Sequence, residues 1–296
     1  MTRFSRRGGV PMRFDSLNAD LKHWLQSSIE AGDDRDVLQQ ALHMAGYDSG
    51  FARGAVEAAL AHVKGPAATV VLTKPAAEPF AGPANTVATS DRTVEILMTL
   101  GSPRVVLLGK VLSGEECEQM IEAARRKLAR STVVNATTGA YDVHPDRTCS
   151  GTHFERGETE LVARIEQRIA ELIDCPVENG EPLQVLHYTP GAEYKPHYDY
   201  FDPAQPGNET VLATGGQRIA TLVIYLNDVL AGGSTVFPAL GLDVLPRRGS
   251  AVYFAYATES GETDPRTLHG GSPVLAGEKW IATKWLRQRR YGGAGT

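Results

Sequence analysis

The C-terminal half of this 296-residue chain alternates short apolar runs with glycine- and proline-rich gaps, and this pattern restricts the fold more than any other feature. The runs begin at steps of roughly eight to twelve residues, which is typical of the short strands of a sandwich or jelly roll. Eight strands are expected, the number in a double-stranded β-helix. They are residues 183–188, 194–200, 218–226, 233–237, 242–245, 250–254, 268–274 and 278–286. We therefore predict an α+β chain, mainly β, with a jelly-roll core.

Two amphipathic segments in front of these strands are expected to be helices that flank the core. Residues 115–130 follow Ser113, a residue type that caps helix N-termini, and carry their apolar side chains on one face. Residues 159–173 repeat this pattern, and we expect that helix to pack on the outside of the sheet. Residues 92–100 and 104–108 alternate or run apolar, which predicts strands at the edge of the same domain.

The first part of the chain has a different organisation. Between Ser16 and Val63, apolar residues recur at three- and four-residue steps with two interruptions, which predicts three short helices. We assign residues 1–63 to a small all-α module, a docking or dimerisation appendage that would allow a homodimer. Residues 64–91 are rich in alanine and proline without periodicity, as an extended linker is. Residues 92–296 then form the main domain.

Composition argues against several classes of protein. With 30 basic and 35 acidic residues the net charge is −5, so no nucleic-acid partner is expected. The basic N-terminus lacks a following apolar region, and no run of 18 apolar residues exists, so we expect neither a signal peptide nor a membrane span. Three scattered cysteines fit buried thiols in a reducing compartment better than disulfides or a zinc site. We expect a cytoplasmic protein whose translation starts at Met1 or Met12.

The segment from Leu186 to Asp202 carries the first candidate site. It is predicted to form two strands joined by a turn at residues 189–191, and the second strand carries His197 and Asp199. Side chains two apart on a strand point to the same face, so these two can converge on a divalent metal. A His-x-Asp triplet alone is weak support, because eight histidines and 35 acidic residues often produce one by chance. With His269 as the third ligand, one face of the metal would stay open, as in non-haem Fe(II) oxygenases.

Three segments strengthen this interpretation: YTPGAEYKPHYDYF, YLNDVLAGGSTVFP and LHGGSPVLAGEKWIATKW. In order and spacing they resemble the prolyl 4-hydroxylase branch of the 2-oxoglutarate- and Fe(II)-dependent dioxygenases, over roughly residues 103–288. The resemblance implies that His197, Asp199 and His269 bind Fe(II). It also implies that Lys279 binds the far carboxylate of 2-oxoglutarate. Since an isolated buried lysine is costly, we expect an anionic partner for Lys279.

The resemblance implies roles for five further residues. Tyr188 and Thr221 match positions that hydrogen-bond the cosubstrate; the alternative for each is a structural side chain of the core. Tyr194 and Trp285 match positions that line the substrate pocket, where a proline ring would pack against aromatic walls. Arg147 lies in a segment near the active site of the family, where it would frame the substrate. A structural arginine on a strand is the alternative there.

The reaction implied by the resemblance is a hydroxylation. It decarboxylates 2-oxoglutarate to succinate and CO₂, with O₂ as the second cosubstrate and ascorbate as the reductant. Asp199 favours hydroxylation, because a glycine or alanine there would open a site for a halide. The expected substrate is a prolyl residue of a peptide or protein, hydroxylated at the 4-position. The same chemistry on a free amino acid or small molecule, a catalytically silent β-barrel binding module and a cupin-type metal enzyme stay open as alternatives.

Two segments beside the predicted strands complete these expectations. Residues 202–217 form a long glycine- and proline-containing loop directly after the metal-binding strand, and we interpret it as a lid that orders over the substrate. Residues 287–296 are basic and rich in glycine, and we expect a frayed end. Cys149 stands where the family has a serine-rich stretch, so local contacts there do not follow from the resemblance.

Overall fold

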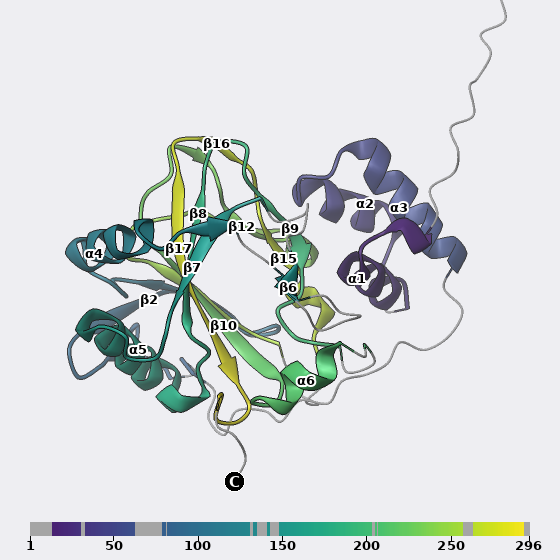
Figure 1. Ribbon diagram of the computed structural model, residues 1–296. Coiled ribbons are helices and arrows are strands. Elements are labelled where there is room, and N and C mark those ends of the chain that lie inside the picture. The colour runs from purple at the N-terminus through teal and green to yellow at the C-terminus, as the bar shows by residue number, and fades with distance from the viewer. Residues whose placement is uncertain are drawn as a thin grey trace, which may run out of the picture.

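A large antiparallel sheet dominates the computed structural model, which describes residues 14–30, 33–62, 79–80, 82–130, 133–134, 141–142, 148–202, 205, 207–256 and 263–292. Its nine strands lie in the order β1-β2-β3-β14-β10-β17-β8-β7-β4 (Figure 1). They are β1 (Thr86–Ala88), β2 (Thr93–Leu100), β3 (Val105–Gly109), β14 (Ala251–Ala255), β10 (Arg218–Tyr225), β17 (Lys279–Arg287), β8 (Leu183–Tyr188), β7 (Ser150–Phe154) and β4 (Ala129–Arg130).

A smaller sheet of four strands, in the order β13-β12-β15-β9, packs against the large one. Val223 and Tyr225 from β10 share a buried apolar cluster with Phe237 from β12 and Val244 from β13. Two antiparallel sheets around one core agree with the predicted jelly roll. The four strands are β13 (Leu242–Val244), β12 (Thr235–Phe237), β15 (His269–Gly271) and β9 (Tyr194–His197). Two further pairs are β11 (Ala231–Gly232) with β16 (Val274–Ala276) and β5 (Val133–Val134) with β6 (Tyr141–Asp142).

Strands β10 and β17 occupy the centre of the large sheet, and their composition explains why. Their sequences are RIATLVIY and KWIATKWLR, and most of their residues are buried. β10 pairs with β14 and β17, and β17 pairs with β10 and β8. A strand with neighbours on both edges and packing on both faces needs apolar side chains on both faces, which these runs supply.

Helices α4 (Gly114–Arg125) and α5 (Glu160–Ile173) cover the outer face of the large sheet (Figure 1). Ser113, the predicted cap of α4, makes a reciprocal capping box with Glu116. Thr159, predicted as the first residue of its helix, is instead the cap of α5 and accepts from the backbone of residue 162. Apolar side chains of both helices share a buried cluster with β3, β8 and β10. The two predicted flanking helices are therefore confirmed, although α4 ends at Arg125 rather than at residue 130.

The described N-terminal residues form three helices in the region where the periodicity predicts them. A 3-10 turn, η1 (Phe14–Ser16), leads into α1 (Ala19–Glu30), α2 (Arg35–Met44) and α3 (Ser49–His62). They lie beside β9 and β15, on the side of the molecule away from α4 and α5 (Figure 1). No helix within the described ranges is both long and apolar enough to cross a membrane.

Several sequence predictions need correction. The predicted strand 194–200 ends at His197, and 268–274 divides into β15 and β16. Strand β7 was not predicted, because SGTHF lacks a clear apolar alternation. The predicted linker 64–91 includes β1, and Phe80 packs on Tyr253 with ring centroids 5.5 Å apart, so structured chain begins before residue 92. Short helical turns not predicted are η2 (Val177–Asn179), η3 (Pro238–Leu240), η4 (Pro265–Thr267) and the helix α6 (Asn208–Ala213).

Candidate active site

The three predicted metal ligands come together at one end of the small sheet. β9 ends at His197, β15 begins at His269, and these two residues pair across the strands. Nε2 of His197 lies 3.6 Å from Oδ1 of Asp199, and Nε2 of His269 lies 3.4 Å from Oδ2. One ligand atom from each residue lies within 4.8 Å of the other two. The strand pairing thus joins two ligands that are far apart in the sequence.

Backbone carbonyls orient both imidazole rings. Nδ1 of His197 donates to the carbonyl oxygen of Lys195 at 2.9 Å, and Nδ1 of His269 donates to that of Thr267 at 3.0 Å. A carbonyl can only accept, so each ring carries its proton on Nδ1 when it is neutral. Nε2 is then left with a lone pair that faces Asp199. This arrangement is the usual way in which proteins orient a metal-binding histidine.

Two hydroxyl groups orient the carboxylate of Asp199. Oγ1 of Thr221 donates to Oδ2 of Asp199 at 2.6 Å, and the hydroxyl of Tyr256 donates to the same oxygen at 3.3 Å. The hydroxyls of Thr221 and Tyr256 are also in contact with each other. All three side chains are buried. Hydrogen bonds from such second partners restrict the rotation of a ligating carboxylate, and their removal commonly weakens metal binding.

The protonation states in the site suit a divalent cation. Burial lowers the pKa of His197, and repulsion from His269 lowers it further. Burial opposes ionisation of Asp199, but the neighbouring imidazoles of His269 and His197 hold the pKa of this carboxyl well below its usual range. A neutral imidazole and an ionised carboxylate are the forms that bind metals. Two histidines and one carboxylate with open positions are the donor set of non-haem Fe(II) sites, so these residues fit the implied iron.

Lys279 is a buried cation at the start of β17. Its ammonium group lies 5.2 Å from the ring of Tyr188 and 5.9 Å from the ring of Tyr225. Burial lowers the pKa of Lys279 to about 8, an effect that Cys149 and Asp243 partly offset. Within the described part of the chain, no carboxylate forms an ion pair with Lys279. The expected anionic partner is therefore not supplied by these residues.

An aromatic ring and two glycines lie close to the side chain of Lys279. Tyr188 on β8 is its cross-strand neighbour in the large sheet. A Cβ atom at Gly271 would lie 3.7 Å from the Lys279 ammonium, and one at Gly233 would lie 3.4 Å from its Cδ. Glycines at both positions therefore keep side chains away from the lysine. A buried cation without a carboxylate partner among the described residues fits the distal carboxylate of a 2-oxo acid.

The structure places the remaining predicted site residues as follows. The ring of Tyr194 stacks on the ring of His197, with centroids 3.6 Å apart. Trp285 pairs with Thr221 across β17 and β10, and the guanidinium carbon of Arg218 lies 3.9 Å from the Trp285 ring. The hydroxyl of Thr221 donates to Asp199, one of the predicted metal ligands. Arg147 lies outside the described residues. The roles of these residues toward substrate and cosubstrate stay predictions.

Sequence reasoning missed a buried ion pair next to the site. Arg218 pairs with Glu181 through two bonds of 2.6 and 2.9 Å, and its Nη1 donates to the backbone carbonyl of Asp199 at 3.2 Å. Tyr256 was missed as well. Arg218 and Tyr256 lie in or next to apolar strands, and nothing in the local sequence separates them from ordinary core or edge residues. Only the strand pairing reveals that they reach Asp199.

The loop after Asp199 is held in place at both ends. The side-chain amide of Gln217 bonds the backbone of Phe201 in both directions, at 2.8 and 2.5 Å. Arg287 donates to the carbonyl oxygens of Gly216 and Val211, at 2.5 and 3.0 Å, and so fixes the end of α6. Backbone bonds also tie residues 288, 289 and 292 to residues 217, 215 and 214. The expected fraying is therefore wrong for residues 287–292, which hold this loop.

Comparisons with known proteins agree with this geometry. A family model described as 2OG-Fe(II) oxygenase superfamily matches residues 183–287, the range that contains all three ligands and Lys279. Prolyl 4-hydroxylase 5 of Arabidopsis thaliana is 42% identical over 220 residues, which are 68% of this chain and 73% of that protein. Prolyl 4-hydroxylase 1 of the same plant is 45% identical over 204 residues, 64% of this chain and 70% of that protein.

Among solved structures, a viral collagen prolyl hydroxylase from Paramecium bursaria Chlorella virus-1 is 31% identical, with a TM-score of 0.49. The likeness covers 62% of this chain and 95% of that one. The identity to the plant proteins, over more than two thirds of the first relative's length, decides the assignment. This chain is a 2-oxoglutarate- and Fe(II)-dependent oxygenase of the prolyl 4-hydroxylase family.

Proposed function

We propose that this protein hydroxylates prolyl residues of a peptide or protein at the 4-position, while 2-oxoglutarate is decarboxylated to succinate and CO₂. The observation that carries the proposal is the combination of two features in one barrel. One is the His197–Asp199–His269 cluster, and the other is the buried, unpaired Lys279. A metal-binding end and a cationic end are what a chelating 2-oxo dicarboxylate requires.

Each residue has a separate task in this scheme. His197, Asp199 and His269 would hold Fe(II), which, with O₂ and 2-oxoglutarate, supplies the oxidising chemistry for a C–H bond. Lys279 neutralises the distal carboxylate of 2-oxoglutarate and orients the molecule toward the ligands. Thr221 and Tyr256 keep the carboxylate of Asp199 from rotating. The apolar walls of the barrel exclude water from the reacting atoms.

Three observations support a prolyl substrate in a peptide rather than a small molecule. The plant relatives that share about 40% of this sequence are named prolyl 4-hydroxylases. The indole N–H of Trp285 is buried and has no hydrogen-bond partner among the described residues, so it can donate to a peptide carbonyl. Tyr194 offers a ring face for packing against proline beside the metal ligands.

The remaining predictions are proposals that depend on sequence or family resemblance. They comprise ascorbate as reductant, a cytoplasmic location, a homodimer, the absence of nucleic-acid partners and a substrate-framing role for Arg147. The division into a helical module (1–63), a linker (64–91) and an oxygenase domain (92–296) has the same status.

Succinate release tests the proposed function directly. The full chain would be assayed under air with 2-oxoglutarate, Fe(II) and ascorbate, with and without a proline-rich peptide. His197→Ala should abolish turnover, whereas Lys110→Ala, which changes an exposed lysine paired with Glu95, should not. Peptide-stimulated succinate release with a mass gain of one oxygen on the peptide would support the proposal. Turnover that ignores every peptide would point to a small substrate, and no turnover with metal bound would contradict an enzyme.

A further inference from the structure

Helix α1 lies across both chain segments that carry the metal ligands. It contacts β9, which ends at His197 and leads to Asp199, and it contacts η4, which leads to His269 (Figure 1). The family model begins at residue 183, so the helices that make these contacts lie outside the matched range. The contact between the N-terminal helices and the site therefore needs its own explanation.

His23 of α1 makes the central contact. Its ring meets the ring of Tyr198 edge-on, with centroids 5.7 Å apart, and the ring of Tyr200 at 6.5 Å. Tyr198 and Tyr200 are buried, and their own rings lie 4.6 Å apart. Both tyrosines are chain neighbours of Asp199, so α1 packs against the segment that presents this ligand. Aromatic pairs of this geometry add to the energy of burial alone.

The two tyrosines pass this contact on to the ligands. The hydroxyl of Tyr198 donates to the carbonyl of Pro265 in η4 at 3.1 Å, which joins the segment of Asp199 to the segment of His269. The ring of Tyr200 lies 5.9 Å from the ring of Tyr256, the residue whose hydroxyl bonds Asp199. Tyr198 and Tyr200 thus connect helix α1 to the segments that carry His197, Asp199 and His269.

The turn between α2 and α3 makes a second contact, at the other end of β9. The ammonium group of Lys195 lies 5.0 Å from the ring of Tyr47 in this turn. The backbone carbonyl of Lys195 is the group that orients His197. A Cβ atom at Gly46 would come within 3.9 Å of Pro273 and 4.0 Å of Glu193, which shows how closely the turn approaches the sheet. The helices therefore hold β9 at both ends.

We propose that the N-terminal helices are a positioning element of the metal site, with His23 as the main contact. They hold the segments of β9 and η4 together, so that the three ligand atoms are in place before the metal binds. This inference goes beyond prolyl hydroxylation, because it concerns metal affinity without any substrate. A failure of the hydroxylation proposal would leave its test unchanged.

The test titrates the metal-free full chain with Co(II) and follows the absorption bands of the bound ion. His23→Ala should weaken Co(II) binding about three- to tenfold, the span that corresponds to one aromatic pair. His23→Phe should restore most of the affinity, because it keeps an aromatic ring against Tyr198. The matched control is His62→Ala: the His62 ring stacks on Phe14 at 4.4 Å, within the N-terminal segment. This control should leave the Co(II) affinity unchanged.

Thermal unfolding of the metal-free variants separates positioning from general stabilisation. Unchanged Co(II) affinity in His23→Ala would overturn the proposal, as would an equal loss in His62→Ala or a loss that His23→Phe does not recover. If His23→Ala lowers the unfolding midpoint, Tyr198→Phe is the second test. It keeps the ring against His23 but removes the hydroxyl that bonds the carbonyl of Pro265, and it should weaken Co(II) binding about two- to tenfold. Unchanged affinity in a stable Tyr198→Phe protein would also count against the proposal.

Discussion

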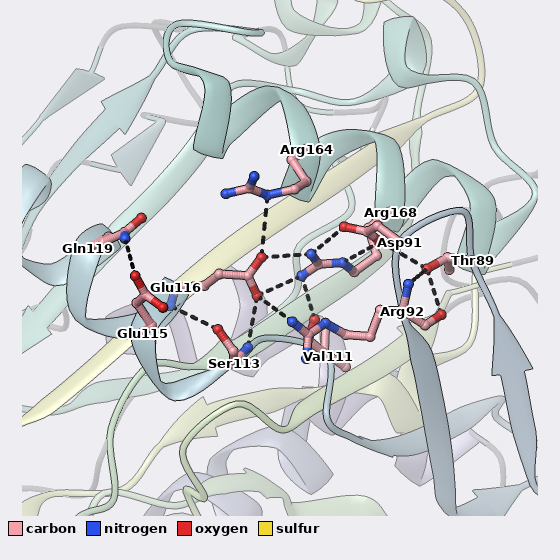
Figure 2. Close-up of polar contacts among 10 residues, drawn as sticks. All are labelled: Thr89, Asp91, Arg92, Val111, Ser113, Glu115, Glu116, Gln119, Arg164 and Arg168. Carbon is pink, nitrogen blue, oxygen red and sulfur yellow. Dashed lines mark hydrogen bonds and ion pairs between the residues drawn. The ribbon is translucent and has the colours of Figure 1, made fainter.

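Two buried cations of this protein, Arg168 and Lys279, have opposite surroundings. Behind the large sheet, Arg168 of α5 donates to Asp91 at 3.0 and 2.5 Å and to Glu116 at 3.1 and 2.7 Å (Figure 2). It also donates to the carbonyl of Val111 at 2.8 Å. Inside the barrel, Lys279 is equally buried but has no carboxylate partner among the described residues. Carboxylates of the protein neutralise Arg168, whereas none of the described carboxylates neutralises Lys279.

The pKa values express this difference. Burial opposes the charge on Arg168, but its bonds to Asp91 and Glu116 raise the pKa of its guanidinium above the ordinary value. For Lys279 burial prevails, and the pKa falls to about 8. A paired buried charge contributes to a specific fold, whereas an unpaired one is tolerated only where a ligand will meet it. The comparison therefore separates a structural cluster from a functional one.

Removing a metal ligand should have the largest effect. Asp199→Ala deletes the one carboxylate of the His197–Asp199–His269 cluster, so Fe(II)-dependent succinate release should fall by more than about 100-fold, beyond the loss typical when a residue that only hydrogen-bonds a ligand is removed. The metal-free variant should still fold, because the change removes a buried charge. Activity assays, with circular dichroism as a control for folding, check this prediction. Retained turnover at saturating Fe(II) would show that Asp199 is not a ligand.

Removing the guanidinium of Arg168 should destabilise the fold. Arg168→Met leaves Asp91 and Glu116 without their buried cation, and we expect the free energy of unfolding to fall by about 3–5 kcal/mol. Urea denaturation of the metal-free protein measures this change. The KM for 2-oxoglutarate should stay at the wild-type value at low temperature. A stability within error of the wild type would mean that Arg92 and Arg164, which also approach Glu116, are sufficient.

Replacing Lys279 with methionine should affect cosubstrate binding and not lower stability, the opposite of Arg168→Met. Lys279→Met removes the cation for 2-oxoglutarate, so its KM should rise about 30-fold or more, as for loss of one partner of a buried charge pair. The free energy of unfolding should stay equal or rise, because an unpaired buried charge is gone. Steady-state kinetics and urea denaturation on one preparation test both parts. A loss of stability like that of Arg168→Met would refute the contrast.

The smallest effect is a dependence on pH. Since the pKa of Lys279 is about 8, the free enzyme loses this cation above that pH, and the KM for 2-oxoglutarate should rise about tenfold per pH unit. The free energy of unfolding changes in the opposite direction: it rises with pH while cosubstrate binding weakens. Between pH 8 and the ordinary lysine value of 10.5, the unfolded chain binds more protons at this residue, so its contribution to stability rises with pH. In Lys279→Met both dependences should be absent.

A local pattern in the sequence predicted that two side chains of the cluster would converge. His197 and Asp199 lie on one short segment, and the caps and periodicity of α4 and α5 are equally local. The hydroxyls that orient Asp199 could not be predicted, because they come from residues 22 and 57 positions away. The expected anionic partner of Lys279 is not a carboxylate of the described residues. The family resemblance assigns that part to the distal carboxylate of the cosubstrate.

Non-local contacts also explain the other corrections. Composition predicted a frayed basic end, but Arg287 bonds backbone carbonyls that lie 71 and 76 residues earlier. Periodicity placed the N-terminal helices without saying what they would cover. Their partners are β9 and the residues directly after it: Lys195 contacts Tyr47 and Tyr198 contacts His23, and neither contact has a sequence pattern of its own. The order of the C-terminal residues and the position of the N-terminal helices both depend on contacts between segments far apart in the sequence.

Strand β17 comes late in the sequence but lies between β10 and β8 in the middle of the large sheet. A chain leaving the ribosome therefore presents two half-sheets with unpaired inner edges until Lys279–Arg287 has emerged. Until then the nascent protein has no cation for 2-oxoglutarate and no tie on the loop after Asp199. From the synthesis of β8 and β10 until that of β17, the inner edges of both strands stay open to edge-to-edge association with other chains.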